Sequence, residues 1–200
     1  MTVYADNAGT TQMSDSVLKA MMPLLTDIYG NPSSLHSVGE IAKEHLEAAR
    51  ETVAECIGAD PKEIYFTSGG SEADNQAIRS AAYIGARKGK KHIISSKFEH
   101  HAVLHTLDAL KKEGFTVTLL DVYSNGSVKP EDVANAITEE TCLVTIMTAN
   151  NEIGTIQPIT EIGKICKEKG VLFHTDAVQA VGHIPVNVKD MNCDMPVSYT

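Results

Sequence analysis

Short apolar runs alternate with longer amphipathic stretches over most of the chain, and this alternation constrains the fold more than any other feature. Continuously apolar strands that are joined by helices form parallel sheets with both faces covered. The sequence therefore predicts an α/β domain whose sheet is mostly parallel and carries helices on both faces. Strands are expected at residues 64–67, 92–95, 115–120, 142–148 and 171–175, and helices at 72–88, 101–113, 130–138 and 159–169.

Two further helices are expected before the first of these strands. Ser14 is a suitable N-cap for a helix whose apolar residues recur at steps of three and four. A second helical pattern runs from about Val38 to Ile57, and Gly58 follows it as a C-terminal stop. Helices and strands together account for the chain without a linker or a repeat.

Charge and cysteine content exclude several classes of function. The formal net charge is −9 and there is no run of Lys or Arg, so a nucleic-acid partner is not expected. No segment approaches the roughly 18 apolar residues that span a bilayer, so no membrane partner is expected either. The four cysteines are far apart and form no CxxC pair, which argues against a zinc site or a disulfide framework. These features favour a reducing, cytoplasmic location.

Mostly polar residues lie at or just after the ends of four of the five predicted strands. In open parallel sheets, ligands bind beyond the carboxyl ends of the strands, so these residues are the first candidates for a site. We expect these strand-end residues to meet at one edge of the sheet. The strand-end residues are Ser68, Gly69, Gly70, Ser71 and Glu72; Ser96, Lys97, Phe98, Glu99, His100 and His101; Asn150, Asn151 and Glu152; and His174, Thr175 and Asp176.

Gly70 and Ser71 stand where a predicted strand runs into a helix. Free backbone N–H groups, a hydroxyl and the helix dipole suit a phosphate at that point, although the dipole contributes only ~0.3–2 kcal/mol. A serine N-cap without a ligand explains the same residues equally well. No Walker loop and no GxGxxG motif is present, so a nucleotide is the poorer choice of phosphate ligand.

Asp176 and His100 favour a flat ligand with a cationic ring nitrogen. A carboxylate at a strand end could pair with a cationic ring nitrogen and raise the pKa of that nitrogen by about one to three units. A protonated pyridine is an electron sink. His100, at the start of a helix on the same edge, could stack on a flat cofactor and move protons, although a lone histidine is more often a simple surface residue.

A metal site on the helix predicted at residues 101–113 is not expected. Glu99, His101 and His105 include two histidines at helical i, i+4 spacing. The segment lacks the HExxH pattern, and a third ligand is not evident.

Six collinear motifs resemble one known family. They cover nearly the whole chain up to about residue 195 and are highly specific as a set. On them the sequence resembles the NifS/IscS-type cysteine desulfurases, which belong to the class V aminotransferase-like, fold-type I enzymes that use pyridoxal 5′-phosphate. The motifs are YADNAGTT (4–11), YGNPSSLHSVG (29–39), FTSGGSEADNQAI (66–78), EHHAVL (99–104), TANNEIGTIQPI (148–159) and FHTDAVQAVG (173–182).

The resemblance implies a role for each matching residue. His100 would stack on the pyridine ring as a catalytic residue, and Asp176 would face the pyridinium nitrogen. Gln179 would bond the phenolic oxygen of the ring, and Asn151 would lie beside the cofactor and the substrate carboxylate. The implied cofactor-binding residues are thus Gly70, Ser71, His100, Asn151, Asp176 and Gln179.

The resemblance also implies the reaction and its partners. L-Cysteine would be converted to L-alanine, and its sulfur would pass to an enzyme cysteine as a persulfide for iron–sulfur cluster or thio-cofactor synthesis. Family members are homodimers, and an iron–sulfur scaffold or sulfur-acceptor protein is a further expected partner. Residues 1–15 would belong to the small domain of the family, and 16–200 to the large, cofactor-binding domain.

Two features of the family have no counterpart in the sequence. The family's Ser-x-Ser-x-His-Lys motif, whose lysine forms the Schiff base, does not follow Met195, and Cys56, Cys142, Cys166 and Cys193 do not match its nucleophilic cysteine. We therefore expect an N-terminal part of a desulfurase that by itself binds the cofactor weakly and is inactive.

Other readings of the resemblance stay open. The whole protein could be a selenocysteine lyase, a cysteine sulfinate desulfinase or another class V aminotransferase-like enzyme. The chain could also be a non-catalytic partner of an intact desulfurase.

Overall fold

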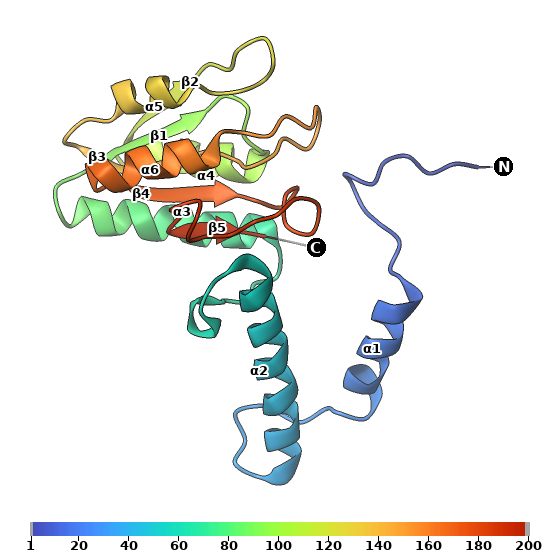
Figure 1. Ribbon diagram of the computed structural model, residues 1–200. Coiled ribbons are helices and arrows are strands. Elements are labelled where there is room, and N and C mark those ends of the chain that lie inside the picture. Colours follow the sequence, from blue (N-terminus) through green and yellow to red (C-terminus); the bar gives the residue numbers. More distant parts are fainter. Residues whose placement is uncertain (1, 199–200) are drawn as a thin grey trace. The chain divides into compact units, whose positions relative to one another are not determined.

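The computed structural model describes residues 2–198 and is shown in Figure 1. The chain divides into two compact units, of which the first ends at Ile64 and the second begins at Tyr65. Each unit has its own secondary structure, and the two are described in turn. The expected division at residue 15 stays a prediction.

The first unit contains the two expected N-terminal helices. Helix α1 (Asp15–Thr26) is capped by Ser14, whose side chain accepts a hydrogen bond from the backbone N–H of Val17. Helix α2 (Ser37–Ile57) ends at Gly58, which has the left-handed φ of 70° that a glycine adopts without steric cost. A short 3₁₀ helix, η1 (Pro61–Glu63), follows. The sequence-based predictions of both long helices are confirmed.

Helix α1 buries none of its residues, although one of its faces is apolar. An amphipathic helix normally gains its stability by packing its apolar face, and within the described residues of the first unit this face has no partner. No described helix is long and apolar enough to cross a membrane. The exposed apolar side chains of α1 are Val17, Leu18, Met21, Met22, Leu24 and Leu25.

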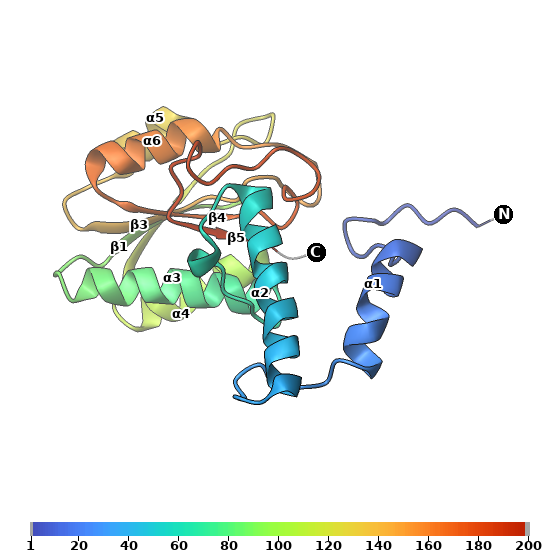
Figure 2. The same cartoon turned by 60° about the horizontal axis from the view of Figure 1, so that its bottom comes forward.

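The second unit is the predicted α/β domain. The five strands among its described residues form one sheet in the order β2-β1-β3-β4-β5, and every pair is parallel. Figure 2 shows α3 and α4 on one face and α5 and α6 on the other. The bounds are α3 (Gly70–Ala86), β1 (His92–Ser96), α4 (His101–Lys112), β2 (Thr116–Leu120), α5 (Pro130–Ala136), β3 (Thr141–Thr145), α6 (Ile159–Lys169), β4 (Leu172–Asp176) and β5 (Met195–Val197).

The main apolar core lies between α3, α4 and the sheet. Ile78 of α3, Ile93 of β1 and Leu107 of α4 are all fully buried there. Burying each such side chain stabilises the fold by ~1.5–3 kcal/mol. The core therefore fixes the first turns of α3 and α4 over the carboxyl ends of the strands.

The predicted strand at 64–67 is wrong. This segment is irregular, with Tyr65 78% and Phe66 51% exposed, and no described strand pairs with it. The guanidinium of Arg50 donates a hydrogen bond to the carbonyl of Ile64, which uses an acceptor that a sheet would need. An apolar run indicates a strand only if a neighbouring strand is present to pair with it.

The last strand, β5, was not predicted. It has three residues and contains Pro196, which cannot donate a hydrogen bond to a sheet. Proline is tolerated because β5 lies at the end of the strand order and pairs only with β4.

Candidate functional site

Three neighbouring strands bring their following residues to one edge of the sheet. Strands β1, β3 and β4 are adjacent and parallel, so their carboxyl ends lie together. The side-chain amide of Asn150, after β3, donates to the carbonyl of Phe98, after β1, at 3.2 Å. The backbone N–H of Thr148 donates to the carbonyl of Asp176, the last residue of β4, at 2.7 Å. These bonds hold the three loops against one another.

The N-terminus of α3 comes to the same edge. Asp74, in the first turns of α3, lies with its Oδ1 3.4 Å from Nε2 of His174 in β4. Gly69 provides no side-chain cap, and the first helical bond runs from the N–H of Ala73 to the carbonyl of Gly69. The N–H groups of residues 70–72 are therefore the donors that a helix leaves unsatisfied. Gly70 and Ser71 carry two of them.

His100 caps helix α4. Its Nδ1 accepts a hydrogen bond from the backbone N–H of Ala102 at 3.2 Å. Because Nδ1 acts as an acceptor, the proton of a neutral ring is assigned to Nε2. The ring is exposed and is held in a defined orientation by the cap.

Asp176 is buried, with 5% of its surface exposed. Its Oδ1 accepts a hydrogen bond from the backbone N–H of Val178 at 3.0 Å. Burial raises the pKa of this carboxyl, and the nearby carboxylate of Asp74 raises it further, while the Val178 bond and the rings of His174 and His100 lower it. Asp176 is thus close enough to His100 for the two to interact electrostatically.

Asn151 and Gln179 are half-buried residues of loops at this edge. Asn151 follows Asn150, whose Oδ1 accepts hydrogen bonds from the backbone N–H groups of Glu152 and Ile153. Gln179 lies three residues after Asp176 in the turn that follows β4. Every sequence-predicted site residue therefore belongs to α3, β4 or a loop at the carboxyl ends of the strands.

Glu99 is a buried carboxyl group beneath this edge. Its Oε1 accepts a hydrogen bond from Ser96 Oγ at 2.6 Å, and its Oε2 accepts one from the backbone N–H of Met147 at 3.0 Å. Burial raises the pKa of Glu99 to about 8, although both hydrogen bonds act in the opposite direction. Glu99 therefore holds a proton near neutral pH and links the loop after β1 to the loop after β3.

The sequence did not assign roles to Asp74, His174 or Glu99. In the sequence, His174 is only one of the polar residues at the end of a predicted strand, and Asp74 is one of several acidic residues near the start of a predicted helix. The signal was nevertheless present, because Asp74 shares the buried face of α3 with Ile78, one turn away. An acidic residue on the apolar face of a helix needs a buried partner.

Glu99 does not join His101 and His105 in a metal site. Its carboxyl group is buried and bonded to Ser96 and Met147, whereas the two histidines stack on the exposed side of α4 with ring centroids 5.5 Å apart. Residues 2–198 contain no group of three or more His, Cys, Asp or Glu residues that could hold a metal ion.

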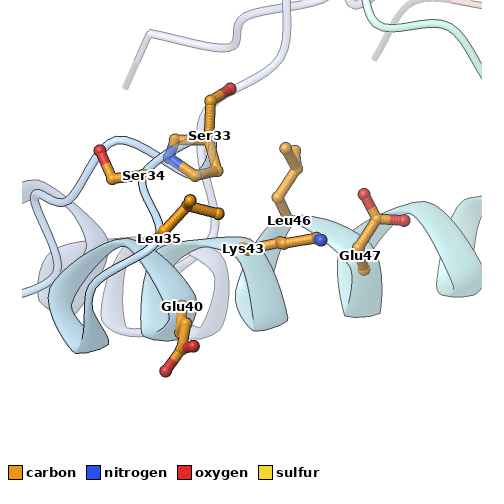
Figure 3. Close-up of a pocket in the computed structure, with 8 residues that line it drawn as sticks. Ser33, Ser34, Leu35, Glu40, Lys43, Leu46 and Glu47 are labelled. Atoms are coloured by element: carbon orange, nitrogen blue, oxygen red, sulfur yellow. The ribbon is translucent and has the colours of Figure 1, made fainter.

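A separate hollow lies in the first unit, between the loop before α2 and the helix itself (Figure 3). It is open and has a volume of about 410 Å³. Figure 3 shows Lys43, Leu46 and Glu47 along the helix and Leu35 in the loop. None of the predicted site residues lines it, so we do not assign the site to this hollow.

Comparison with known proteins agrees with this arrangement. The family model described as "Aminotransferase class-V" matches residues 3–198. The chain belongs to the class-V aminotransferase family. Within it, the chain is 55% identical over 193 residues to a protein of Clostridium botulinum named cysteine desulfurase IscS, covering 96% of this chain and 48% of that protein.

Solved structures give the same result. A structure named NifS-like protein superposes with a TM-score of 0.96 at 41% identity, covering 100% of this chain and 55% of that one. A structure of SspA in complex with cysteine superposes with a TM-score of 0.95 at 40% identity, covering 99% of this chain and 57% of that one. These similarities confirm the α/β fold and the resemblance to cysteine desulfurases. The chain spans about half the length of the curated relatives it matches.

Proposed function

We propose that this chain forms the cofactor-binding part of a cysteine desulfurase that uses pyridoxal 5′-phosphate. One observation carries the proposal. The buried carboxyl group of Asp176 and the uncapped N-terminus of α3 lie at the same edge of the sheet. A phosphorylated pyridine needs a phosphate site and an anion for its ring nitrogen, and this edge offers both.

The N-terminus of α3 fits the phosphate of the cofactor. Its backbone N–H groups at Gly70 and Ser71 and the hydroxyl of Ser71 would donate hydrogen bonds to the phosphate oxygens. Ser71 is exposed, so its hydroxyl is accessible to a ligand. Glu72 does not block this position, because its carboxylate turns back to the backbone N–H of Ser68 at 2.7 Å.

Asp176 and His100 would hold the ring between them. When bound, pyridoxal phosphate supplies an electron sink for the carbanion chemistry. The carboxylate of Asp176 would keep the proton on the ring nitrogen, because an opposite charge favours the cationic form. His100 would cover the ring face, and Nε2 would be its proton-carrying atom because Nδ1 is engaged with Ala102.

Asn151 and Gln179 would fix the orientation of cofactor and substrate. Gln179 would bond the phenolic oxygen of the ring, and Asn151 would lie beside the substrate carboxylate. Their positions at the ends of β3 and β4 support these roles. Orientation of this kind contributes to catalysis because it replaces a bimolecular encounter by a positioned one.

The whole protein would convert L-cysteine to L-alanine. The C–S bond of the substrate would break, and its sulfur would be transferred to a cysteine thiol of the enzyme, forming a persulfide. The outer sulfur of that persulfide could then be passed to a scaffold or acceptor protein for iron–sulfur cluster or thio-cofactor synthesis. Support comes from the relatives named cysteine desulfurase and from the similar SspA structure that contains cysteine.

Dimerisation and a cytoplasmic location belong to the same proposal. The exposed apolar face of α1 supports a homodimer, because an apolar helix face of this kind is normally covered. The four cysteines are all free, which is compatible with a reducing compartment.

A chimeric protein tests the proposed activity. The chain replaces the matching half of the Clostridium botulinum relative, and alanine and persulfide are measured after addition of pyridoxal phosphate and L-cysteine. We expect both products, with the unaltered relative as a positive control. A folded, cofactor-loaded chimera that makes no alanine from L-cysteine would contradict the proposal.

The same chimera separates the alternatives. Activity on selenocysteine with none on cysteine would identify a selenocysteine lyase, and activity only on cysteine sulfinate would identify a desulfinase. A non-catalytic partner would instead remain inactive in the chimera on all three substrates and would co-purify with an intact desulfurase.

A further inference from the structure

Asp74 and His174 form a buried pair behind the candidate site. The side chains are 2% and 0% exposed, and Asp74 Oδ1 lies 3.4 Å from His174 Nε2. This distance exceeds that of an ordinary N–H···O hydrogen bond. Within the described chain, however, neither atom has a hydrogen-bond partner. The two atoms nevertheless lie within ion-pair distance of each other, and the attraction between opposite charges does not require ideal hydrogen-bond geometry.

The other nitrogen of His174 also has a partner. Nδ1 lies 2.8 Å from Thr145 Oγ1 in the adjacent strand β3. A doubly protonated ring would donate from Nδ1 to this hydroxyl oxygen. Its Nε2–H group would lie at ion-pair distance from the carboxylate of Asp74. A buried ionised carboxylate without a cation would instead carry a large desolvation cost.

The Asp74–His174 pair lies next to Asp176, so its charge affects the ionisation of that residue. Asp176 follows His174 by two residues in β4, and the titratable groups that face it are Asp74, His174, His100 and Glu99. Glu99 holds its proton near neutral pH, since burial raises its pKa to about 8. The net charge of the Asp74–His174 pair therefore decides whether Asp176 has a second anion beside it. An adjacent anion would oppose ionisation of Asp176.

We propose that His174 carries a positive charge that neutralises Asp74, and that this neutral pair leaves Asp176 as the single anion at the strand ends. Asp74 and His174 are then positioning residues, which act on the cofactor through Asp176 without touching it. The inference rests on the proposed function because it assumes that Asp176 meets a cationic ring. It adds the reason why a carboxyl group surrounded by two further buried carboxyl groups can ionise.

The first test needs no cofactor. The full chain is labelled with ¹⁵N in its histidine rings, and the protonation of both nitrogens of His174 is read by NMR at pH 7. We expect protons on both nitrogens in the unaltered chain and on one nitrogen in Asp74→Asn. A singly protonated His174 in the unaltered chain would overturn the proposal.

The second test uses binding of pyridoxine 5′-phosphate, which lacks the aldehyde and so cannot react with lysines. His174→Gln leaves Asp74 as an unpaired anion, which raises the pKa of Asp176 further and should weaken binding by at most about tenfold for each pK unit of that rise. Adding Asp74→Asn removes that anion and should restore binding. A loss that the second substitution does not restore, or no loss at all, would contradict the proposal.

The two tests separate the pair from the cofactor site. If the unaltered chain fails to bind pyridoxine 5′-phosphate, the proposed function fails, and the NMR experiment still decides the charge of His174. If His174→Gln does not fold, the NMR spectrum of the unaltered chain still shows whether His174 carries a positive charge.

Discussion

The carboxyl group of Glu99 accepts a hydrogen bond from the backbone N–H of Met147 at 3.0 Å. This bond joins the loop after β1, which carries His100, to the loop after β3, which leads to Asn151. Because Glu99 is buried, it also makes the site sensitive to pH. The position of two site loops therefore depends on a group that titrates near physiological pH.

Because of Glu99, the free energy of unfolding should decrease as pH rises. Its pKa is about 8 in the folded chain against an ordinary 4.5. Between these values the folded state holds a proton that the unfolded state releases, so stability falls with increasing pH by at most ~1.4 kcal/mol per pH unit. Hydrogen exchange of the buried amides of β1, measured from pH 5 to 9, reports this slope.

Glu99→Gln should remove that slope, because the amide is neutral and keeps an oxygen for the N–H of Met147. The exposed Glu168→Gln is the matched control and should leave the slope unchanged. An equally steep decline in Glu99→Gln would show that Glu99 is not the group responsible.

Gly163 permits close packing between α6 and the turn before β5. A Cβ at this position would lie 1.9 Å from the carbonyl oxygen of Met191. Gly163→Ala must therefore displace the backbone, and we expect a loss of about 1–3 kcal/mol in the free energy of unfolding. Urea unfolding measures it. Thr160→Ala, at an exposed position of the same helix, should have little effect, and equal stability of the two variants would refute this packing.

The apolar face of α1 should make the chain self-associate. Leu25 is 67% exposed, and covering a side chain of this size contributes ~1.5–3 kcal/mol. Leu25→Glu should shift the sedimentation coefficient toward that of a monomer. Lys19→Gln, on the polar side of the helix, should not. A chain that sediments as a monomer before any substitution would remove this support for a homodimer.

Local sequence patterns predicted most of the second unit. Strands β2 and β4 were predicted because each short apolar run follows a helix whose last residues are lysines and a glycine, KKEG up to Gly114 and KEKG up to Gly170. The segment 64–67 has the same pattern but forms no strand, since pairing depends on a neighbour that a local pattern does not contain. Strand β5 was missed because three residues around a proline give no periodic signal.

The site was predictable as far as it follows from topology. Parallel neighbouring strands place His100, Asn151 and Asp176 at one edge, and this relation can be read from strand order. The contact between Asp74 and His174 could not be read in this way. The two residues are far apart in the sequence, and helical periodicity shows that Asp74 is buried without showing which residue it meets.

Asp176 should decide the affinity for the pyridine ring. Asp176→Asn retains an oxygen for the N–H of Val178 but loses the negative charge. We expect binding of pyridoxine 5′-phosphate to weaken about tenfold or more, because an opposite charge shifts the ring nitrogen by one to three pK units. Asp190→Asn, an exposed carboxylate outside the edge, is the control. An unchanged affinity in Asp176→Asn would show that the carboxylate of Asp176 does not interact with the pyridine ring.

Mapping that ligand on the chain tests the central claim most directly. Pyridoxine 5′-phosphate is added to the ¹⁵N-labelled chain, and the backbone amide shifts are followed by NMR. The account predicts that the largest shifts occur together at Ser71, His100, Asn151 and Asp176. Shifts concentrated elsewhere, for example around Lys43 in the hollow of Figure 3, or no shifts at millimolar ligand, would contradict a cofactor site at the carboxyl ends of the strands.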